Sequence, residues 1–127
     1  MRNIALLGLG AFVALSFAGT AMADTMSETF GNTVLSTNDK GETTKVWFKA
    51  DSTYAFEDSK GVKGSGRWVL KDGQYCDTPN LATDAAVGTP APKEMCFEYQ
   101  AAHKVGDKWS QKNGEAKTIK VEIKKGT

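Results

Sequence analysis

The sequence predicts an all-β fold, in which a single antiparallel meander of about eight strands closes into a small barrel or half-barrel held by one disulfide. Beyond Asp24, no amphipathic helical pattern is longer than two turns, and short segments instead alternate apolar and polar residues. Turn-forming residues interrupt these segments roughly every ten residues, a spacing typical of all-β domains. The chain also has two cysteines, an even number that favours a disulfide.

Residues 1–23 have the pattern of a secretory signal peptide. Arg2 provides a positive charge, residues 4–17 are almost wholly apolar or small, and Ala21-Met22-Ala23 matches a typical cleavage site. A retained membrane anchor is the alternative, but the apolar run is shorter than the ~20 residues that a bilayer core requires. We therefore expect periplasmic or secreted localisation and no integral membrane segment after cleavage. The expected organisation is a signal peptide over 1–23 and an all-β domain over 24–127.

Short alternating segments give the strands of this domain, which begins with an expected frayed end over 24–30. The strands are predicted over 31–37, 43–50, 53–57, 62–71, 74–77, 94–100, 108–111 and 117–124. The last is the clearest, because Ile119, Val121 and Ile123 alternate with charged residues. Asp72-Gly73 and Asn113-Gly114 are strong hairpin signals, since such turns need residues that accept positive φ. Successive hairpins make the sheet antiparallel.

Closure of the sheet follows from its one-sided pattern. An alternating sheet must cover its apolar face, and a barrel does so while removing open edges, which favours a barrel over a sandwich. Gly64 and Gly66 precede Trp68 on the same predicted face. We interpret these glycines as relief of crowding on a strongly curved strand.

Cys76 and Cys96 are predicted to form the disulfide. In an oxidising compartment an even cysteine count indicates a bridge, and closing a loop of about 20 residues restricts the unfolded chain by about 3 kcal/mol. A metal site or a redox pair is the alternative, but His103 is the chain's one histidine and no C-x-x-C spacing occurs. The cysteines bracket residues 78–93, a segment rich in Pro, Ala and Thr. This long loop is either a partner-binding element or a surface insertion without a role.

Aromatic side chains give the strongest candidates for a binding site. Inward-facing positions of the predicted strands carry six of them: Phe48, Tyr54, Phe56, Trp68, Phe97 and Tyr99. One interpretation is that they fill the core. The other is a cleft or barrel mouth in which Tyr54, Trp68 and Tyr99 bind a small apolar or sugar-like ligand. Trp47 lies on the opposite, polar face, where it either packs beneath a neighbouring segment or marks a contact surface.

No catalytic constellation stands out, so we predict no catalytic residues, cofactors or metal ligands. The sequence lacks a nucleophile elbow, a P-loop, a dinucleotide fingerprint and a zinc-protease motif. His103 lies in a predicted turn and is expected to be solvent-exposed. One of the 16 basic residues lies in the predicted signal peptide, so the remainder balances the 15 acidic ones, which argues against nucleic acid as a partner.

Three segments carry a resemblance to known proteins: residues 45–54, 64–68 and 72–76. Their sequences, KVWFKADSTY, GSGRW and DGQYC, resemble the successive turn, strand and hairpin of uncharacterised small exported β-proteins of alphaproteobacterial type. They are more distantly similar to lipocalin-like half-barrel domains. Ser52 stands where that theme usually has glycine. The resemblance implies a fold and an exported address, and it implies no activity.

These observations favour a non-enzymatic periplasmic or secreted binding module, which binds a small apolar ligand or another exported protein. A structural, envelope-associated protein without a ligand is one alternative. A hydrolase that uses carboxylates is the other, since a β-domain rich in acidic residues can bring two of them together.

Overall fold

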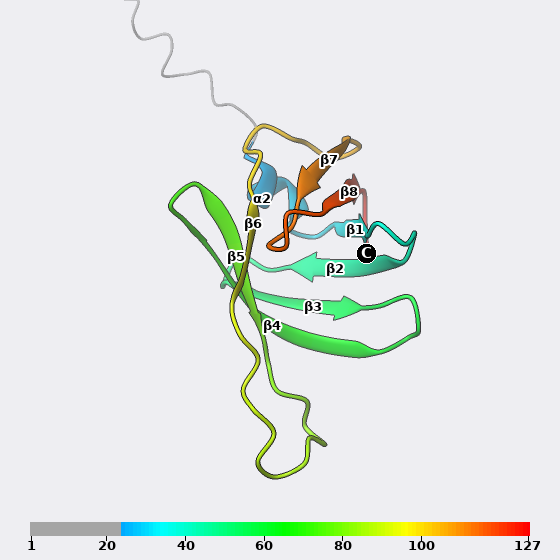
Figure 1. Ribbon diagram of the computed structural model, residues 1–127. Helices are drawn as coiled ribbons and strands as arrows, with labels where there is room; N and C mark the ends of the chain where they lie inside the picture. Colours follow the sequence, from blue (N-terminus) through cyan, green and yellow to red (C-terminus); the bar gives the residue numbers. More distant parts are fainter. Residues whose placement is uncertain (1–23) are drawn as a thin grey trace, which may run out of the picture.

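The computed structural model describes residues 24–127, and the predicted signal peptide lies outside the described residues. It contains one short helix, α2 (Thr25–Thr29), and eight strands, which confirms the predicted all-β fold (Figure 1). The strands are β1 (Thr33–Thr37), β2 (Thr43–Phe48), β3 (Thr53–Glu57), β4 (Lys63–Lys71), β5 (Gln74–Pro79), β6 (Met95–Glu98), β7 (Lys108–Lys112) and β8 (Thr118–Lys124). Within the described part of the chain, no helix has the length and apolar character needed to cross a bilayer.

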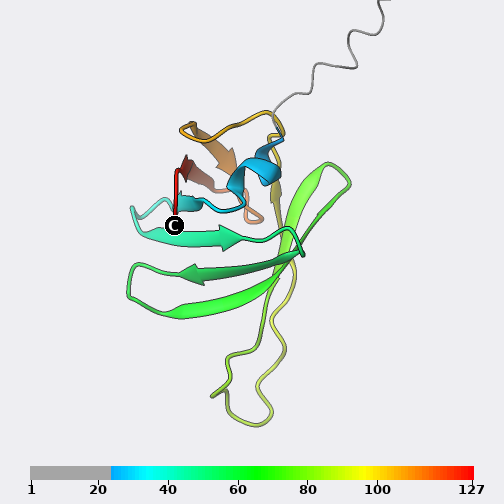
Figure 2. The same ribbon diagram turned by 180° about the vertical axis from the view of Figure 1, so that it is seen from behind.

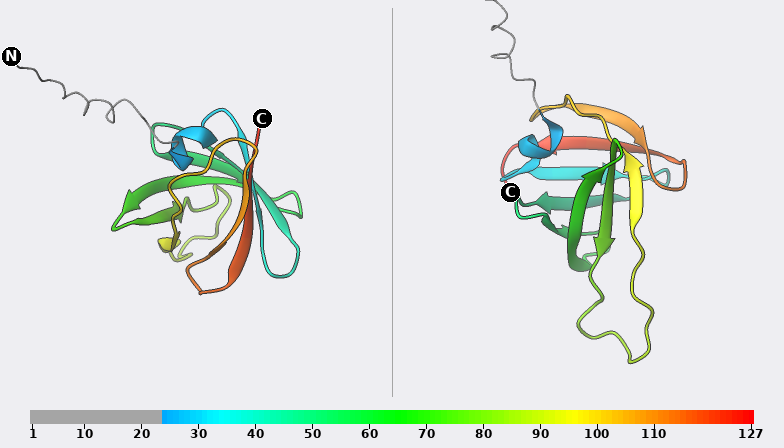
Figure 3. Two further views of the ribbon diagram at one scale, coloured as in Figure 1. Left: turned by 90° about the horizontal axis from the view of Figure 1, so that it is seen from above. Right: turned by 90° about the vertical axis from the view of Figure 1, so that its left-hand side faces the viewer.

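The strands form one antiparallel sheet in the order β6-β5-β4-β3-β2-β1-β8-β7. The first strand pairs with the last along its whole length, from Thr33 opposite Lys124 to Thr37 opposite Lys120. This pairing curls the meander into a nearly closed barrel, which Figure 3 shows from above and from the side. Within residues 24–127, β6 and β7 are the two end strands of the sheet, and they face each other without a backbone ladder.

Two glycines in β4 lie opposite aromatic residues of β3. The first half of β4 pairs with β3 and its second half pairs with β5. Gly64 lies opposite Phe56, and Gly66 lies opposite Tyr54. A Cβ atom on Gly64 would lie 2.5 Å from Phe56 Cζ, and one on Gly66 would lie 2.5 Å from both the Tyr54 hydroxyl and the Thr78 carbonyl oxygen. The glycines therefore leave the space that the facing aromatic rings occupy, as the sequence predicted.

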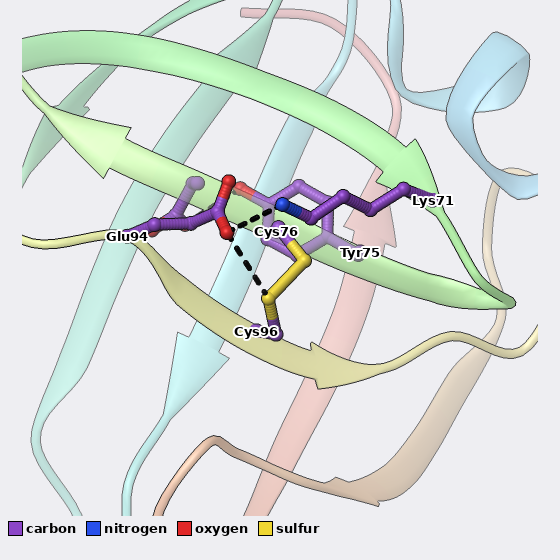
Figure 4. The surroundings of a disulfide bond; sticks show 6 residues. Lys71, Tyr75, Cys76, Glu94 and Cys96 are labelled. Atoms are coloured by element: carbon purple, nitrogen blue, oxygen red, sulfur yellow. Dashed lines mark hydrogen bonds and ion pairs between the residues drawn. A yellow bond between two sulfur atoms is a disulfide. The ribbon is translucent and has the colours of Figure 1, made fainter.

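The disulfide between Cys76 and Cys96 is confirmed, and it joins residues directly opposite each other on β5 and β6. Tyr75 and Phe97, the neighbouring opposed pair, line the interior, so alternation places the sulfurs on the outer face. Figure 4 shows Glu94 beside the bridge, with Oε1 3.8 Å from Cys96 Sγ. Lys71 Nζ donates a hydrogen bond of 2.6 Å to the same oxygen.

A long loop, residues 80–94, joins the two bridged strands. It projects well away from the body of the barrel in both views (Figures 1 and 2). Asn80, the first residue of the loop, is held against β4 by two hydrogen bonds. Its backbone N–H donates to the Ser65 carbonyl oxygen at 2.8 Å, and its side-chain amide donates to the Ser65 hydroxyl at 3.0 Å. At its tip, Val87 is fully exposed.

The expected frayed end over 24–30 is wrong, because this segment forms α2 and covers one end of the barrel (Figure 2). Thr25, Met26 and Thr29 are buried on the face turned to the interior. Met26 belongs to the main hydrophobic cluster, and the rest of that cluster comes from four strands: Val34, Phe48, Tyr54, Ile119 and Val121. The segment is too short to be a stable helix alone, so burial and tertiary hydrogen bonds stabilise it.

Candidate functional site

A cavity of about 120 Å³ lies inside the barrel beneath α2. Its walls come from the helix, from strands β1, β2, β5, β6, β7 and β8, and from the two residues that follow β6. The lining residues are Thr25, Met26, Thr29, Val34, Ser36, Val46, Phe48, Tyr75, Asp77, Phe97, Tyr99, Gln100, Trp109, Gln111, Ile119 and Val121. The surface is mostly apolar, with a few hydroxyl, amide and carboxyl groups, which is the usual character of a small-molecule site.

Aromatic rings make the largest flat surfaces of this cavity. The rings of Phe48 and Tyr75 lie edge to face with their centroids 5.6 Å apart, and Tyr75 and Phe97 are tilted at the same separation. Both arrangements are favourable for aromatic quadrupoles. Trp109 faces this group from β7, and its indole N–H donates a hydrogen bond of 2.7 Å to the Gln111 side-chain oxygen. The rings are thus fixed by packing and hydrogen bonds before any ligand arrives.

Asp77 is the one carboxyl group in the lining. Its Oδ2 accepts a hydrogen bond of 2.7 Å from the Tyr75 hydroxyl. Burial raises the pKa of Asp77 above its usual value, the nearby charge of Glu94 raises it further, and the hydrogen bond from Tyr75 opposes both. Burial and the Asp77 charge also raise the pKa of Tyr75, so at neutral pH this phenol stays protonated and remains a donor.

Tyr99 ties α2 to the barrel. Its hydroxyl donates to Asp24 Oδ1 at 2.8 Å and accepts from the backbone N–H of Met26 at 3.2 Å. The hydrogen bond from the Tyr99 hydroxyl holds the pKa of Asp24 below its usual value. Burial, together with the hydrogen bond to Asp24, raises the pKa of Tyr99 to about 12. Thr25 adds a second attachment, because its hydroxyl donates to the Gln100 carbonyl oxygen at 2.5 Å.

His103 lies in the loop between β6 and β7, near the attachment of α2. Its side chain is only partly exposed, so the expectation that it is solvent-exposed is wrong. Its ring stacks on Trp109 with centroids 3.7 Å apart and planes 4° apart. Nε2 lies 2.8 Å from Gln100 Oε1, and Nδ1 lies 3.2 Å from Asp107 Oδ2. Since both ring nitrogens already have partners within the loop, the geometry supports a role in positioning Trp109 rather than in proton transfer.

The four aromatic residues predicted as ligand contacts are not brought together. Tyr99 lines the cavity, whereas Tyr54 and Trp68 pack in the barrel wall outside its lining. Trp68 donates its indole N–H to the Lys49 carbonyl oxygen at 3.1 Å. Trp47 packs on the outside of the barrel, where its indole N–H donates to the Thr33 hydroxyl at 3.0 Å. Their roles as ligand contacts stay predictions.

Two lining residues that matter chemically, Asp77 and Trp109, were missed as site candidates from the sequence. Asp77 lies two residues after Tyr75, and this spacing places both side chains on one face of a strand. An acidic residue on the aromatic face of a strand could therefore have been recognised from the sequence as a site candidate. Trp109 gave no comparable signal, because its strand is short and its contact with His103 depends on the loop conformation.

Among residues 24–127, one group of potential metal ligands comes together: Cys76, Glu94 and Cys96. The disulfide occupies both sulfurs, so this group does not offer thiolates to a metal. Comparison of the chain with protein-family models, with curated proteins and with solved structures finds no match.

Proposed function

We propose that this chain is an exported, non-enzymatic binding protein whose barrel interior holds one small and largely apolar ligand. The cavity beneath α2 carries this proposal. Its volume of about 120 Å³ approaches that of the ~150 Å³ apolar cavities that bind benzene, so a single ring fits its scale. The disulfide supports the exported address, because such bridges persist in oxidising compartments.

Two features favour binding over hydrolysis at this site. Glycoside hydrolysis needs a pair of carboxyl groups facing one substrate, and the cavity lining contains Asp77 alone. His103, the chain's one histidine, has both ring nitrogens engaged and is absent from the lining. The polar groups of the cavity are thus suited to orienting a ligand, and the lining lacks an acid–base pair.

The route to the cavity is most easily opened at the seam between β6 and β7. Phe97 and Gln100 line the cavity from one side of the seam, and Trp109 and Gln111 line it from the other. No backbone ladder has to break for these two strands to separate, because within the described chain they are the ends of the sheet. Displacement of α2 would widen the same opening.

Benzyl alcohol, a neutral single-ring probe, tests the proposal by ¹H–¹⁵N NMR. The chain has three tryptophans, and Trp109 alone lines the cavity. Saturable binding inside the barrel should shift the indole N–H signal of Trp109 and leave those of Trp47 and Trp68 in place. Equal shifts of all three signals, or none up to the solubility of the probe, would overturn the proposal.

A cavity-filling variant makes this test specific. Val121→Phe places a ring where a buried lining residue stands and should abolish the shift of Trp109. Val69→Phe adds the same atoms at a position that is 44% exposed, so it should leave binding unchanged. Circular dichroism spectra of both variants establish that each retains the β-fold.

A protein partner remains the second candidate because of loop 80–94. Leu81 and Val87 are 45% and 105% exposed on a projection braced at its base by the disulfide and by Asn80. Exposed apolar side chains on a projecting loop are suited to contacting another exported protein. A variant with residues 82–92 replaced by a short Gly-Ser linker should lose any such partner in pull-downs from envelope extract, and capture that survives this change would exclude the loop.

A further inference from the structure

The cavity carries a single formal charge, and this charge is negative. Asp77 is the one acidic residue in its lining, and no lysine, arginine or histidine contributes to the walls. Glu94, whose charge also acts on Asp77, is paired with Lys71 outside the cavity, so the negative charge of the interior belongs to Asp77. The electrostatic environment of the interior therefore repels anions and attracts cations.

Asp77 lacks a cationic partner within the described residues. Its one side-chain hydrogen bond comes from the neutral Tyr75 hydroxyl at 2.7 Å. The ion pairs that the described chain does form involve other carboxyl groups, Glu94 with Lys71 and Asp107 with His103. A partly buried carboxylate without a counter-ion destabilises the folded protein, so its presence facing a cavity points to a bound partner that supplies the positive charge.

The aromatic walls favour the same kind of ligand. The faces of aromatic rings carry partial negative charge, and an ammonium group over such a face gains energy, more so when it is shielded from water. Phe48, Tyr75, Phe97 and Trp109 present rings to the cavity that also holds the carboxyl group. Ring faces beside one carboxylate are a recurrent way to bind organic ammonium groups.

We propose that the ligand of this cavity is a small organic cation, in which an ammonium group faces Asp77 and a compact apolar group rests on the rings. This inference depends on the proposed binding function and specifies the ligand class for the same site. A ligand of about one ring is the size that the volume of about 120 Å³ admits. Binding would neutralise Asp77 and thereby offset the cost of burying its charge.

Benzylammonium and benzyl alcohol form a matched pair of probes, since they share one ring and differ in the charge of the polar group. At neutral pH, we expect benzylammonium to bind at least tenfold more tightly, with both probes shifting the Trp109 indole signal. Asp77→Asn should reduce the affinity for benzylammonium to within threefold of that for benzyl alcohol, whose own affinity should stay within about twofold. Retained binding of the neutral probe establishes that the variant cavity is intact.

Glu94→Gln is the control for a general effect of negative charge. Glu94 is paired with Lys71 outside the cavity, so this variant should keep the tenfold preference. Equal affinities of the two probes for the unmodified protein would overturn the inference and leave the proposed function standing. Tight benzylammonium binding that survives Asp77→Asn would overturn it as well. Failure of both probes to shift the Trp109 signal would instead overturn the proposed function.

Discussion

The barrel is closed by backbone pairing between β1 and β8, whereas β6 and β7 meet without a backbone ladder. The two regions are therefore held by different kinds of hydrogen bond. Between β1 and β8, five consecutive residue pairs continue the backbone ladder around the cylinder. Between β6 and β7, side chains make the connection: Glu98 accepts from the Lys112 backbone N–H at 3.0 Å, and the Gln100 amide donates to the Ser110 carbonyl oxygen at 3.0 Å. A side-chain connection opens without unfolding the sheet, and the cavity lies beside it.

This difference indicates how stability and binding are divided within a small domain. The laddered region contains Ile123, the largest of the fully buried side chains, which is 0% exposed and pairs with Val34. The seam region contributes three of the five aromatic lining residues, Phe97, Tyr99 and Trp109. Segments with few backbone ladder bonds open locally at a low cost in free energy, so the proposed ligand site lies beside the part of the barrel that opens most readily.

Truncation of Ile123 should have the largest effect on the closed region. Ile123→Ala removes a fully buried side chain from the β1–β8 pairing, and such truncations cost about 2–5 kcal/mol. Urea denaturation followed by circular dichroism measures the loss. Lys124→Ala, at the exposed neighbouring position, should change the free energy of unfolding by less than about 0.5 kcal/mol. A loss below 1 kcal/mol for Ile123→Ala would show that the β1–β8 region is not the main source of stability.

Removal of the disulfide should have the next largest effect, and it should act on one side of the seam. The bridge spans 20 residues, so the double variant Cys76→Ala with Cys96→Ala should lose about 3 kcal/mol of stability. Hydrogen exchange should accelerate in β6 more than in β1 or β8, because the bridge joins β6 to its single ladder partner. Uniform acceleration throughout the sheet would contradict this regional assignment.

Loss of a side-chain contact across the seam should reduce the stability less than loss of the disulfide. Glu98→Ala removes the acceptor of the Lys112 N–H, and a surface hydrogen bond of this kind contributes about 0.5–1.5 kcal/mol. Hydrogen exchange at Lys112 should become faster, while exchange at the amides between β1 and β8 should stay unchanged. Glu115→Ala is the matched control, since its side chain lies exposed in the β7–β8 turn. Protection of Lys112 in Glu98→Ala equal to that of the unmodified protein would mean that the seam is closed by other contacts.

Tyr99→Phe tests how α2 is held over the seam, and its signature is pH dependence. The variant loses the hydrogen bonds to Asp24 and Met26, at a cost of about 1 kcal/mol at neutral pH. The pKa of Asp24 is lowered in the folded state, so this carboxyl stabilises the fold above its unfolded pKa of about 3.8, and the contribution disappears as the pH falls through the lowered folded pKa. The variant should therefore lose less stability on acidification than the unmodified protein. Parallel stability curves of the two proteins between about pH 2 and 5 would contradict this mechanism.

Most of the barrel was predictable, because the signals that define it are local. Two-residue alternation located the strands, and Asp72-Gly73 located the β4–β5 hairpin, with positive φ values of 52° and 73°. Asn113-Gly114 does lie between β7 and β8, but in that longer turn Ala116 has the positive φ, and neither Asn113 nor Gly114 does. The glycines opposite Tyr54 and Phe56 were interpretable for the same reason. Sequence patterns report the face on which a side chain lies, and this sufficed for the fold.

The site was less predictable, since it depends on contacts between distant segments. The helix α2 forms because Thr25 and Met26 bond to residues about 75 positions away, which no local pattern reveals. Tyr54 and Tyr99 share the inward face of the sheet, but only Tyr99 lies next to the cavity. Which aromatic residues fill space and which enclose it depends on how β6 and β7 approach each other, and the unpaired seam fixes that distance through side chains.

The smallest expected change in stability is an increase rather than a loss. It comes from a substitution far from the seam, in the turn between β2 and β3. Ser52 has a φ of 72°, a left-handed conformation that disfavours residues with a Cβ atom. Ser52→Gly should therefore stabilise the protein by about 0.5–1 kcal/mol, measured as a rise in the midpoint of thermal unfolding. Ser59→Gly, in the next turn, is the control: this serine is not among the residues with positive φ, so glycine there should be neutral or destabilising. If both variants shift stability equally, relief of backbone strain at Ser52 is not the cause.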